Sequence, residues 1–182
     1  MDERLEQAAA RVARGDRAAF RTVVELTSAR LYRLAARIMG GAADAEDALQ
    51  DAYLRAFQAL SGQEFDGRAS VSSWLYRIAT NACLDALRRR RPRPAAERGE
   101  ATIAREPSFD GLLAAEARAA LREIDRWLGE LPPEQRAALV LKTMEEMTSA
   151  EIGELLGCSE GAVEQLLVRA RAALRQHHGE GS

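Results

Sequence analysis

The stretch TSAEIGELLGCSEGAVEQLLVRARAAL, residues 148–174, carries the densest structural signal in the chain. Thr148 followed three residues later by Glu151 forms a capping box, which predicts that a short helix opens here. Gly157 suits the left-handed backbone that ends many helices, and Ser159 can cap a second helix. The apolar stripe of that second helix comprises Val163, Leu167, Ala170 and Leu174. A short helix, a turn with glycine and a longer helix together predict a helix-turn-helix.

The remainder of the chain also follows helical periodicity. Apolar residues recur at intervals of three and four over 16–39, and again over 44–60. A third helix is predicted to begin after the N-cap Ser70 and to end at Arg91, because Pro92 forbids continuation. Aromatic residues are only 5% of the sequence and alternating Val/Ile/Thr runs are missing, so strands have little support. We therefore expect an all-α protein.

Composition shifts divide the 182 residues into two small helical domains. Residues 92–109 contain proline, glycine and mixed charge without a sustained period, which predicts a flexible linker. The N-terminal domain is then 1–91 and the C-terminal helix-turn-helix domain is 110–176. The polar, glycine-containing residues 177–182 are expected to form a disordered tail.

The net charge of −2 and the pI near 5.8 exclude a general basic field that would hold nucleic acid non-specifically. Residues 1–91 nevertheless hold 15 basic and 12 acidic side chains, whereas residues 133–182 hold 5 and 8. Any contact with DNA must therefore be local.

The residue types of an active site are scarce. The only histidines are His177 and His178 in the tail, and the sequence has no glycine-rich phosphate loop or hydrolase motif. Cys83 and Cys158 lack a CxxC spacing and a nearby histidine, so we expect plain buried thiols. The carboxylates at 44–51 lie along an open helix face, which does not enclose a cation. We expect no catalytic residue, no metal and no cofactor.

No apolar run approaches the roughly 20 residues that span a bilayer. The N-terminus has acidic residues where a signal peptide has an apolar core. We therefore expect no membrane insertion and a cytoplasmic protein.

Three long segments resemble one known family. They are DAEDALQDAYLRAF (44–57), FDGRASVSSWLYRIATNACLDALRRRR (65–91) and LPPEQRAALVLKTMEEMTSAEIGELLGCSEGAVEQLLVRARAALR (131–175). In order and spacing, residues 10–176 resemble the extracytoplasmic-function (ECF) sigma factors of bacterial RNA polymerase. The resemblance implies a two-domain initiation factor that binds core RNA polymerase, melts the −10 promoter element and reads the −35 element. It also implies regulation by an anti-sigma factor, because no fused sensor domain is visible.

Each role maps onto residues of this chain. In such factors the segment matching 44–51 docks on a basic coiled coil of the polymerase, through complementary charge and hydrogen bonds. The resemblance therefore assigns polymerase binding to Asp44, Glu46, Asp47, Gln50 and Asp51. The bland alternative is a set of acids that only favour a helix N-terminus.

Melting a promoter requires that unpaired bases be held by a positive groove, hydrogen bonds and stacking surfaces. The helix that follows Ser70 offers polar and basic side chains on or near one ridge, and we expect these to bind the −10 element: Ser72, Ser73, Arg77, Asn81, Asp85, Arg88 and Arg89. Trp74 falls on the apolar stripe, so we expect it in the core. The alternative is a solvated face with a basic last turn, which suits the helix dipole.

The last helix is expected to read the −35 element through Ser159, Glu160, Ala162, Glu164, Gln165, Val168, Arg169 and Arg171. Many family members resemble GTVKSRLHRAR here, whereas this chain has Glu164, Leu166 and Val168 at three polar or basic sites. A glutamate can accept from cytosine N4, but it weakens the phosphate electrostatics that support most affinity. We therefore expect weak reading, assisted by tethering to the polymerase.

Three other functions stay open. Leu166 and Val168 could form an exposed apolar patch for an anti-sigma factor or another regulator, in place of DNA. A sigma-like mimic could occupy an anti-sigma factor without starting transcription. A plain helix-turn-helix repressor is the third alternative, but it leaves the acidic and arginine-ended helices unexplained.

Overall fold

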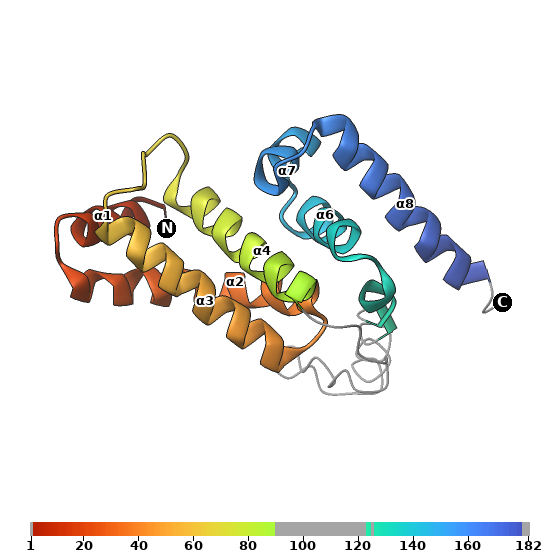
Figure 1. The fold of residues 1–182 in the computed structure, drawn as a ribbon, viewed down its shortest axis with the longest axis horizontal. Coiled ribbons are helices and arrows are strands. Elements are labelled where there is room, and N and C mark those ends of the chain that lie inside the picture. The colour runs from red at the N-terminus through yellow and green to blue at the C-terminus, as the bar shows by residue number, and fades with distance from the viewer. Residues whose placement is uncertain (1, 90–122, 125, 180–182) are drawn as a thin grey trace.

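The computed structural model describes residues 2–89, 123–124 and 126–179. Throughout these ranges the regular structure is helical, as expected (Figure 1). The expected linker at 92–109 lies outside the described residues, as does most of the helix predicted to follow residue 110.

Residues 2–89 form four α-helices and one short 3-10 helix. They are α1 (Asp2–Ala13), η1 (Arg17–Ala19), α2 (Phe20–Met39), α3 (Ala42–Ser61) and α4 (Val71–Arg89). The three helices predicted in this half are thereby confirmed. Helix α1 was not predicted, although Leu5, Ala8 and Val12 bury a helical stripe against the other helices.

The ends of these helices follow from local chemistry. Gly40 ends α2 with a φ of 70°, a left-handed conformation that glycine adopts without a Cβ clash. Ser70 caps α4, because its hydroxyl oxygen accepts from the backbone N–H of Ser73 at 3.1 Å. The Glu6 carboxylate of α1 accepts from the N–H of Val71 at 2.7 Å, so a second acceptor holds the same helix start.

The C-terminal half contains α6 (Pro133–Met144), α7 (Ser149–Leu156) and α8 (Glu160–Gly179). The capping box of Thr148 and Glu151 is present, and Gly157 ends α7 with a φ of 72°. Ser159 caps α8 by accepting from the N–H of Ala162 at 3.2 Å. The predicted helix-turn-helix is therefore confirmed. Helix α8 runs through residue 179, and thus three residues into the segment expected to be disordered.

The two halves pack against each other. Figure 1 shows α4 between α3 on one side and α6 with α7 on the other, and α8 covers the far side of α6. Buried residues of both halves form one continuous apolar cluster. We expected two separate units joined by a flexible hinge, but α2 and α4 carry apolar side chains that the C-terminal helices cover.

Candidate polymerase and nucleic-acid interfaces

The acidic residues of α3 occupy one outer face. Glu46, Asp47 and Gln50 are exposed, whereas Asp44 and Asp51 are partly buried. The opposite stripe is buried in the core: Ala45, Ala48, Leu49, Ala52, Ala56 and Leu60. The structure thus brings the five predicted polymerase-binding residues onto the accessible side of one rigid helix. Leu54, which is 57% exposed, extends this face by one turn and was not predicted.

Asp51 has a second set of contacts. Its carboxylate accepts from the guanidinium of Arg55 at 2.6 Å, and Arg89 lies 3.9 Å away. Arg55 also donates to Asp85 of α4 at 3.1 Å. The hydrogen bond with Asp85, aided by that with Asp51, raises the pKa of Arg55 above its usual value. The predicted polymerase-binding helix and the predicted DNA-binding helix therefore share one ion-pair network.

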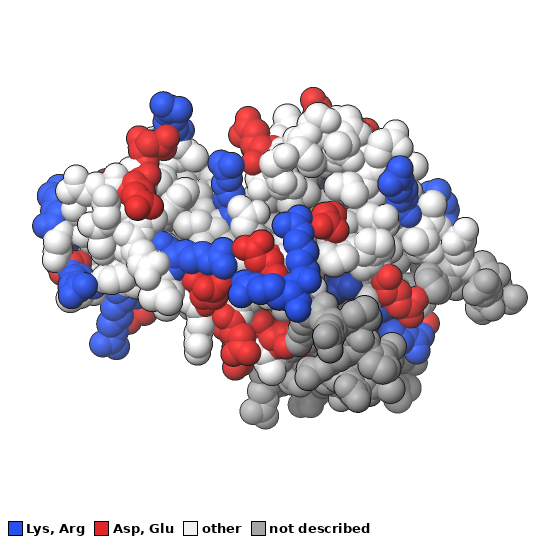
Figure 2. All heavy atoms as spheres, in the orientation of Figure 1, with Lys and Arg blue, Asp and Glu red and all other residues white. Residues whose placement is uncertain are grey.

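The predicted −10 ridge runs along α4. Ser73, Arg77, Arg88 and Arg89 are exposed, whereas Ser72, Asn81 and Asp85 are partly buried. The residues differ in how far they are engaged. Asp85 lies 3.8 Å from Arg88, and Arg88 reaches Glu134 of α6 at 3.2 Å, whereas the described residues give Arg77 no ion pair. Figure 2 shows acidic and basic groups interleaved over this part of the surface.

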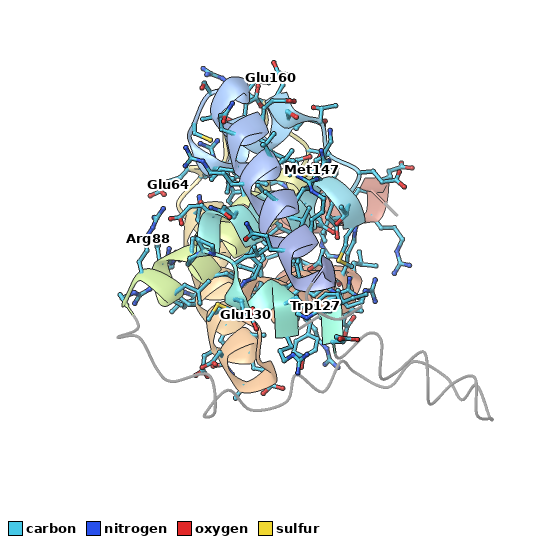
Figure 3. The ribbon with its side chains drawn as sticks, turned by 90° about the vertical axis from the view of Figure 1, so that its right-hand side faces the viewer. Glu64, Arg88, Trp127, Glu130, Met147 and Glu160 are labelled. Atoms are coloured by element: carbon cyan, nitrogen blue, oxygen red, sulfur yellow. The ribbon has the colours of Figure 1, made fainter. Side chains whose placement is uncertain are left out.

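Figure 3 labels Arg88 on the α4 end of this seam, with its side chain directed outward from the helix. Its contact with Glu134 is 46 residues distant in sequence. Sequence periodicity did not predict this contact, because it depends on how the two halves pack.

An aromatic pair marks the start of α4. The rings of Phe65 and Trp74 lie 4.8 Å apart between centroids, at 46° to each other. Both side chains are partly buried, so Trp74 lies at the edge of the core and not within it. Such a pair can present a stacking surface beside the polar ridge.

The outer face of α8 is polar and mostly uncharged by basic groups near its start. Seven of the eight predicted −35 residues are exposed and Ala162 is partly buried. Figure 3 shows Glu160 at the start of α8, far from Trp127 and Glu130 near its other end. Val168 is 53% exposed, whereas Leu166 packs partly against the core. The apolar patch considered for a regulator therefore reduces to Val168.

Glu164 does not simply point into solvent. Its carboxylate accepts from the hydroxyl of Ser149 on α7 at 2.9 Å. Ser149 is 5% exposed, so this bond ties the two helices of the helix-turn-helix together at a buried group. Sequence reasoning treated Glu164 only as a residue facing DNA.

Other functional chemistry finds little support in the described ranges. No group of three or more His, Cys, Asp or Glu side chains gathers there where it could hold a metal ion. Cys83 is buried, and burial raises the pKa of its thiol to about 12, while Cys158 is partly buried. None of the helices described is both long and apolar enough to cross a membrane.

Comparison with known proteins agrees with this architecture. Residues 23–93 match the family model for Sigma-70 region 2, and residues 121–174 match that for Sigma-70 region 4. The ECF RNA polymerase sigma factor SigW of Bacillus subtilis is 32% identical over 184 residues, which cover 97% of each chain. The chain belongs to the ECF sigma factors of bacterial RNA polymerase.

Other relatives support the same assignment. The ECF sigma factor SigM of Mycobacterium tuberculosis is 41% identical over 93% of this chain and 81% of its own. The solved structure of CnrH in complex with the cytosolic domain of CnrY has a TM-score of 0.68 and 28% identity, over 98% of this chain and 99% of CnrH. As an ECF sigma factor, the protein acts with core RNA polymerase and promoter DNA in transcription initiation. The region 2 match accounts for the N-terminal half that a plain repressor leaves unexplained.

Proposed function

We propose that this ECF sigma factor docks on core RNA polymerase through Asp44, Glu46, Asp47, Gln50 and Asp51 of α3. The observation that carries this proposal is the shared exposed face of one rigid helix, backed by a fully buried alanine and leucine stripe. A rigid backing fixes the spacing of the carboxylates, which favours electrostatic complementarity with a basic partner.

The −10 element is held along α4. Arg77 and Arg89 neutralise phosphates, Asn81 and Asp85 reach base edges, and Ser72 and Ser73 add hydrogen bonds near the Phe65 and Trp74 rings. Glu6 and Ser70 fix the start of this helix, so the aromatic pair and the ridge keep their relative positions. Residues 1–91 thus form the domain that binds polymerase and melts the promoter.

The −35 element is read by residues 110–176 through α8, weakly. Arg169 and Arg171 face phosphates, while Gln165 and Val168 are placed for base edges and a thymine methyl group. Glu160 and Glu164 lower the local positive potential at the first turns of the helix. Tethering to the polymerase through α3 raises the effective concentration of this domain at the promoter.

The protein works in the cytoplasm, and an anti-sigma factor regulates it. CnrH was solved with the cytosolic domain of CnrY, which supports a protein regulator for this related chain as well. No residue of the chain is assigned a catalytic role.

Reconstitution tests the proposal. The purified protein is expected to bind core RNA polymerase stoichiometrically and to yield run-off transcripts from a genomic promoter library. Asp47→Arg is expected to weaken polymerase binding at least about tenfold, because it places a cation against a basic surface. Glu25→Arg on the exposed side of α2 is the matched control and should leave binding unchanged. Polymerase binding without transcripts would favour the sigma-like mimic, and no binding at all would refute the docking site.

A further inference from the structure

Helix α4 is buried along two faces, although the periodicity of its sequence predicted only one. One stripe meets α2 and α3 and includes Val71, Leu75, Ala79 and Ala82. Tyr76, Thr80 and Leu84 follow at intervals of four and form a second stripe, with exposed fractions of 7%, 0% and 3%. Because α4 also packs against α6 and α7, this second stripe is an interaction surface occupied by the C-terminal half of the same chain.

A buried ion pair stands at one edge of this surface. Two nitrogens of the Arg30 guanidinium, on α2, donate to Oε2 of Glu145 at 3.1 and 2.8 Å. The Glu145 side chain is only 9% exposed. The Arg30 guanidinium also lies over the Tyr76 ring, 5.0 Å from its centroid. Burial, and then the neighbouring Glu145 carboxylate, raise the pKa of Tyr76 far above its ordinary value, which places all three groups together.

A second polar contact closes the other side. Arg136 of α6 is 5% exposed, and its guanidinium donates to the carbonyl oxygen of Ile38 at 2.9 Å. That carbonyl belongs to the last turn of α2, where backbone acceptors have no partner within the helix. The same guanidinium donates to the carbonyls of Gly129 and Leu131 at 2.7 and 3.0 Å. The C-terminal half thus caps a helix of the N-terminal half.

The packed arrangement cannot serve a promoter. Elements at −10 and −35 lie about 25 base pairs apart, which is about 85 Å of duplex at about 3.4 Å per base pair. A compact chain of 182 residues has a radius of gyration of only about 16 Å. The α4 ridge and the outer face of α8 therefore reach their two elements together only after the halves separate.

We propose that the free protein closes on itself and restrains its own activity, with the Arg30 and Glu145 pair as the latch that holds the C-terminal half on the second stripe of α4. Closure occupies Arg88 through Glu134 and keeps the two DNA-reading surfaces too close to span a promoter. Polymerase or promoter binding must overcome the latch, so only the open fraction is competent. The functional consequence rests on the proposed sigma function, whereas the closure itself does not.

Burial is what makes this pair a latch. Exposed ion pairs contribute little because water and salt screen them. Reversing one partner of a buried pair leaves a desolvated charge beside a like charge, which strongly disfavours the packed state. Glu145 lies at the C-terminal end of α6 and Arg30 is half exposed, so separation returns both groups to water without dismantling either half.

Charge reversal and charge exchange test the latch in the full chain. Arg30→Glu and Glu145→Lys are each expected to raise the radius of gyration measured by small-angle X-ray scattering. The double exchange Arg30→Glu with Glu145→Lys is expected to return it toward the wild-type value. Arg21→Glu is the matched control, because Arg21 lies on the same helix and pairs with Glu25 in an exposed contact at 2.8 Å. Circular dichroism on each variant separates opening from unfolding, and Glu145→Gln provides a milder opening variant.

The second readout is affinity for core RNA polymerase. An opened variant is expected to bind about tenfold more tightly or better, because apparent affinity scales with the competent fraction. An expanded wild-type chain, or single reversals that keep wild-type dimensions, would overturn the latch. If no variant binds polymerase while scattering still responds to the reversals, the proposed function fails and the closure stands.

Discussion

The carboxylate of Glu164 on α8 accepts a hydrogen bond from the hydroxyl of Ser149 on α7, with 2.9 Å between the two oxygens. The bond braces the helix-turn-helix at the position where the sequence places an acid in front of DNA. Glu164 therefore has two opposing effects, since it stabilises the domain and weakens its attraction for phosphates.

Replacing Glu164 separates these two effects. Glu164→Lys is expected to tighten binding to a −35 duplex at low salt and to steepen the salt dependence by about one phosphate contact. It is also expected to destabilise the domain by about 1 kcal/mol, because the Ser149 hydroxyl loses its acceptor. Fluorescence anisotropy over a salt series, together with urea unfolding, measures both.

The control for that change is Glu164→Gln, which keeps an acceptor for Ser149 and removes the charge. It should leave stability near wild type and tighten DNA binding less than lysine does. If the lysine variant binds DNA no more tightly than wild type, α8 does not face the phosphates.

Arg77 and Arg88 are expected to differ in their contribution to holding the −10 strand. Arg77 is exposed with no ion pair among the described residues, whereas Arg88 is engaged by Asp85 and Glu134. Arg77→Ala should therefore weaken binding of a single-stranded −10 oligonucleotide more than Arg88→Ala does, by up to about tenfold. Glu134→Gln should strengthen binding, because it releases Arg88. Equal losses for the two alanine variants would show that the ion pairs with Arg88 cost nothing to break.

Local signals in the sequence predicted the helices and their ends well. The capping box at Thr148, the glycine at Gly157 and the caps at Ser70 and Ser159 all lie where short-range chemistry put them. Each depends on residues within four positions of one another, so a linear pattern is sufficient.

Long-range contacts could not be predicted in the same way. Glu6 caps a helix 65 residues away, and Arg30 meets Glu145 across 115 residues. Both are polar residues on otherwise ordinary helix faces, so nothing in their own spacing distinguishes them from solvated side chains. The second buried stripe of α4 carried a weak signal at Tyr76, Thr80 and Leu84, but its mixed polarity hid it within an amphipathic helix.

The capping box predicts a specific pH dependence. Hydrogen bonds from the Thr148 N–H and hydroxyl hold the pKa of Glu151 below its ordinary value. A carboxylate with a lowered pKa in the folded state stabilises the protein above its unfolded pKa, and the benefit disappears as pH falls through the folded value. The difference in unfolding free energy between wild type and Glu151→Gln should thus be constant above about pH 5 and shrink below it. Urea titrations from pH 7 to pH 3 measure this difference, and one that grows on acidification would contradict the assigned bonds.

Two glycines of the helix-turn-helix offer a matched test of its tight turn. A Cβ placed on Gly153 would lie 2.7 Å from the carbonyl oxygen of Cys158, whereas a Cβ on Gly161 meets nothing within 4 Å. Backbone cannot move aside as a flexible side chain can, so Gly153→Ala is expected to destabilise the domain by about 1–3 kcal/mol. Gly161→Ala should instead stabilise it by about 0.5–1 kcal/mol, because alanine favours the interior of a helix. Thermal and urea unfolding distinguish the two signs. Because displacing the turn would also reorient α8, Gly153→Ala should lose −35 binding under conditions in which it remains folded, while Gly161→Ala retains it. If Gly153→Ala proves as stable as wild type, α7 and the turn do not approach each other as closely as the structure places them.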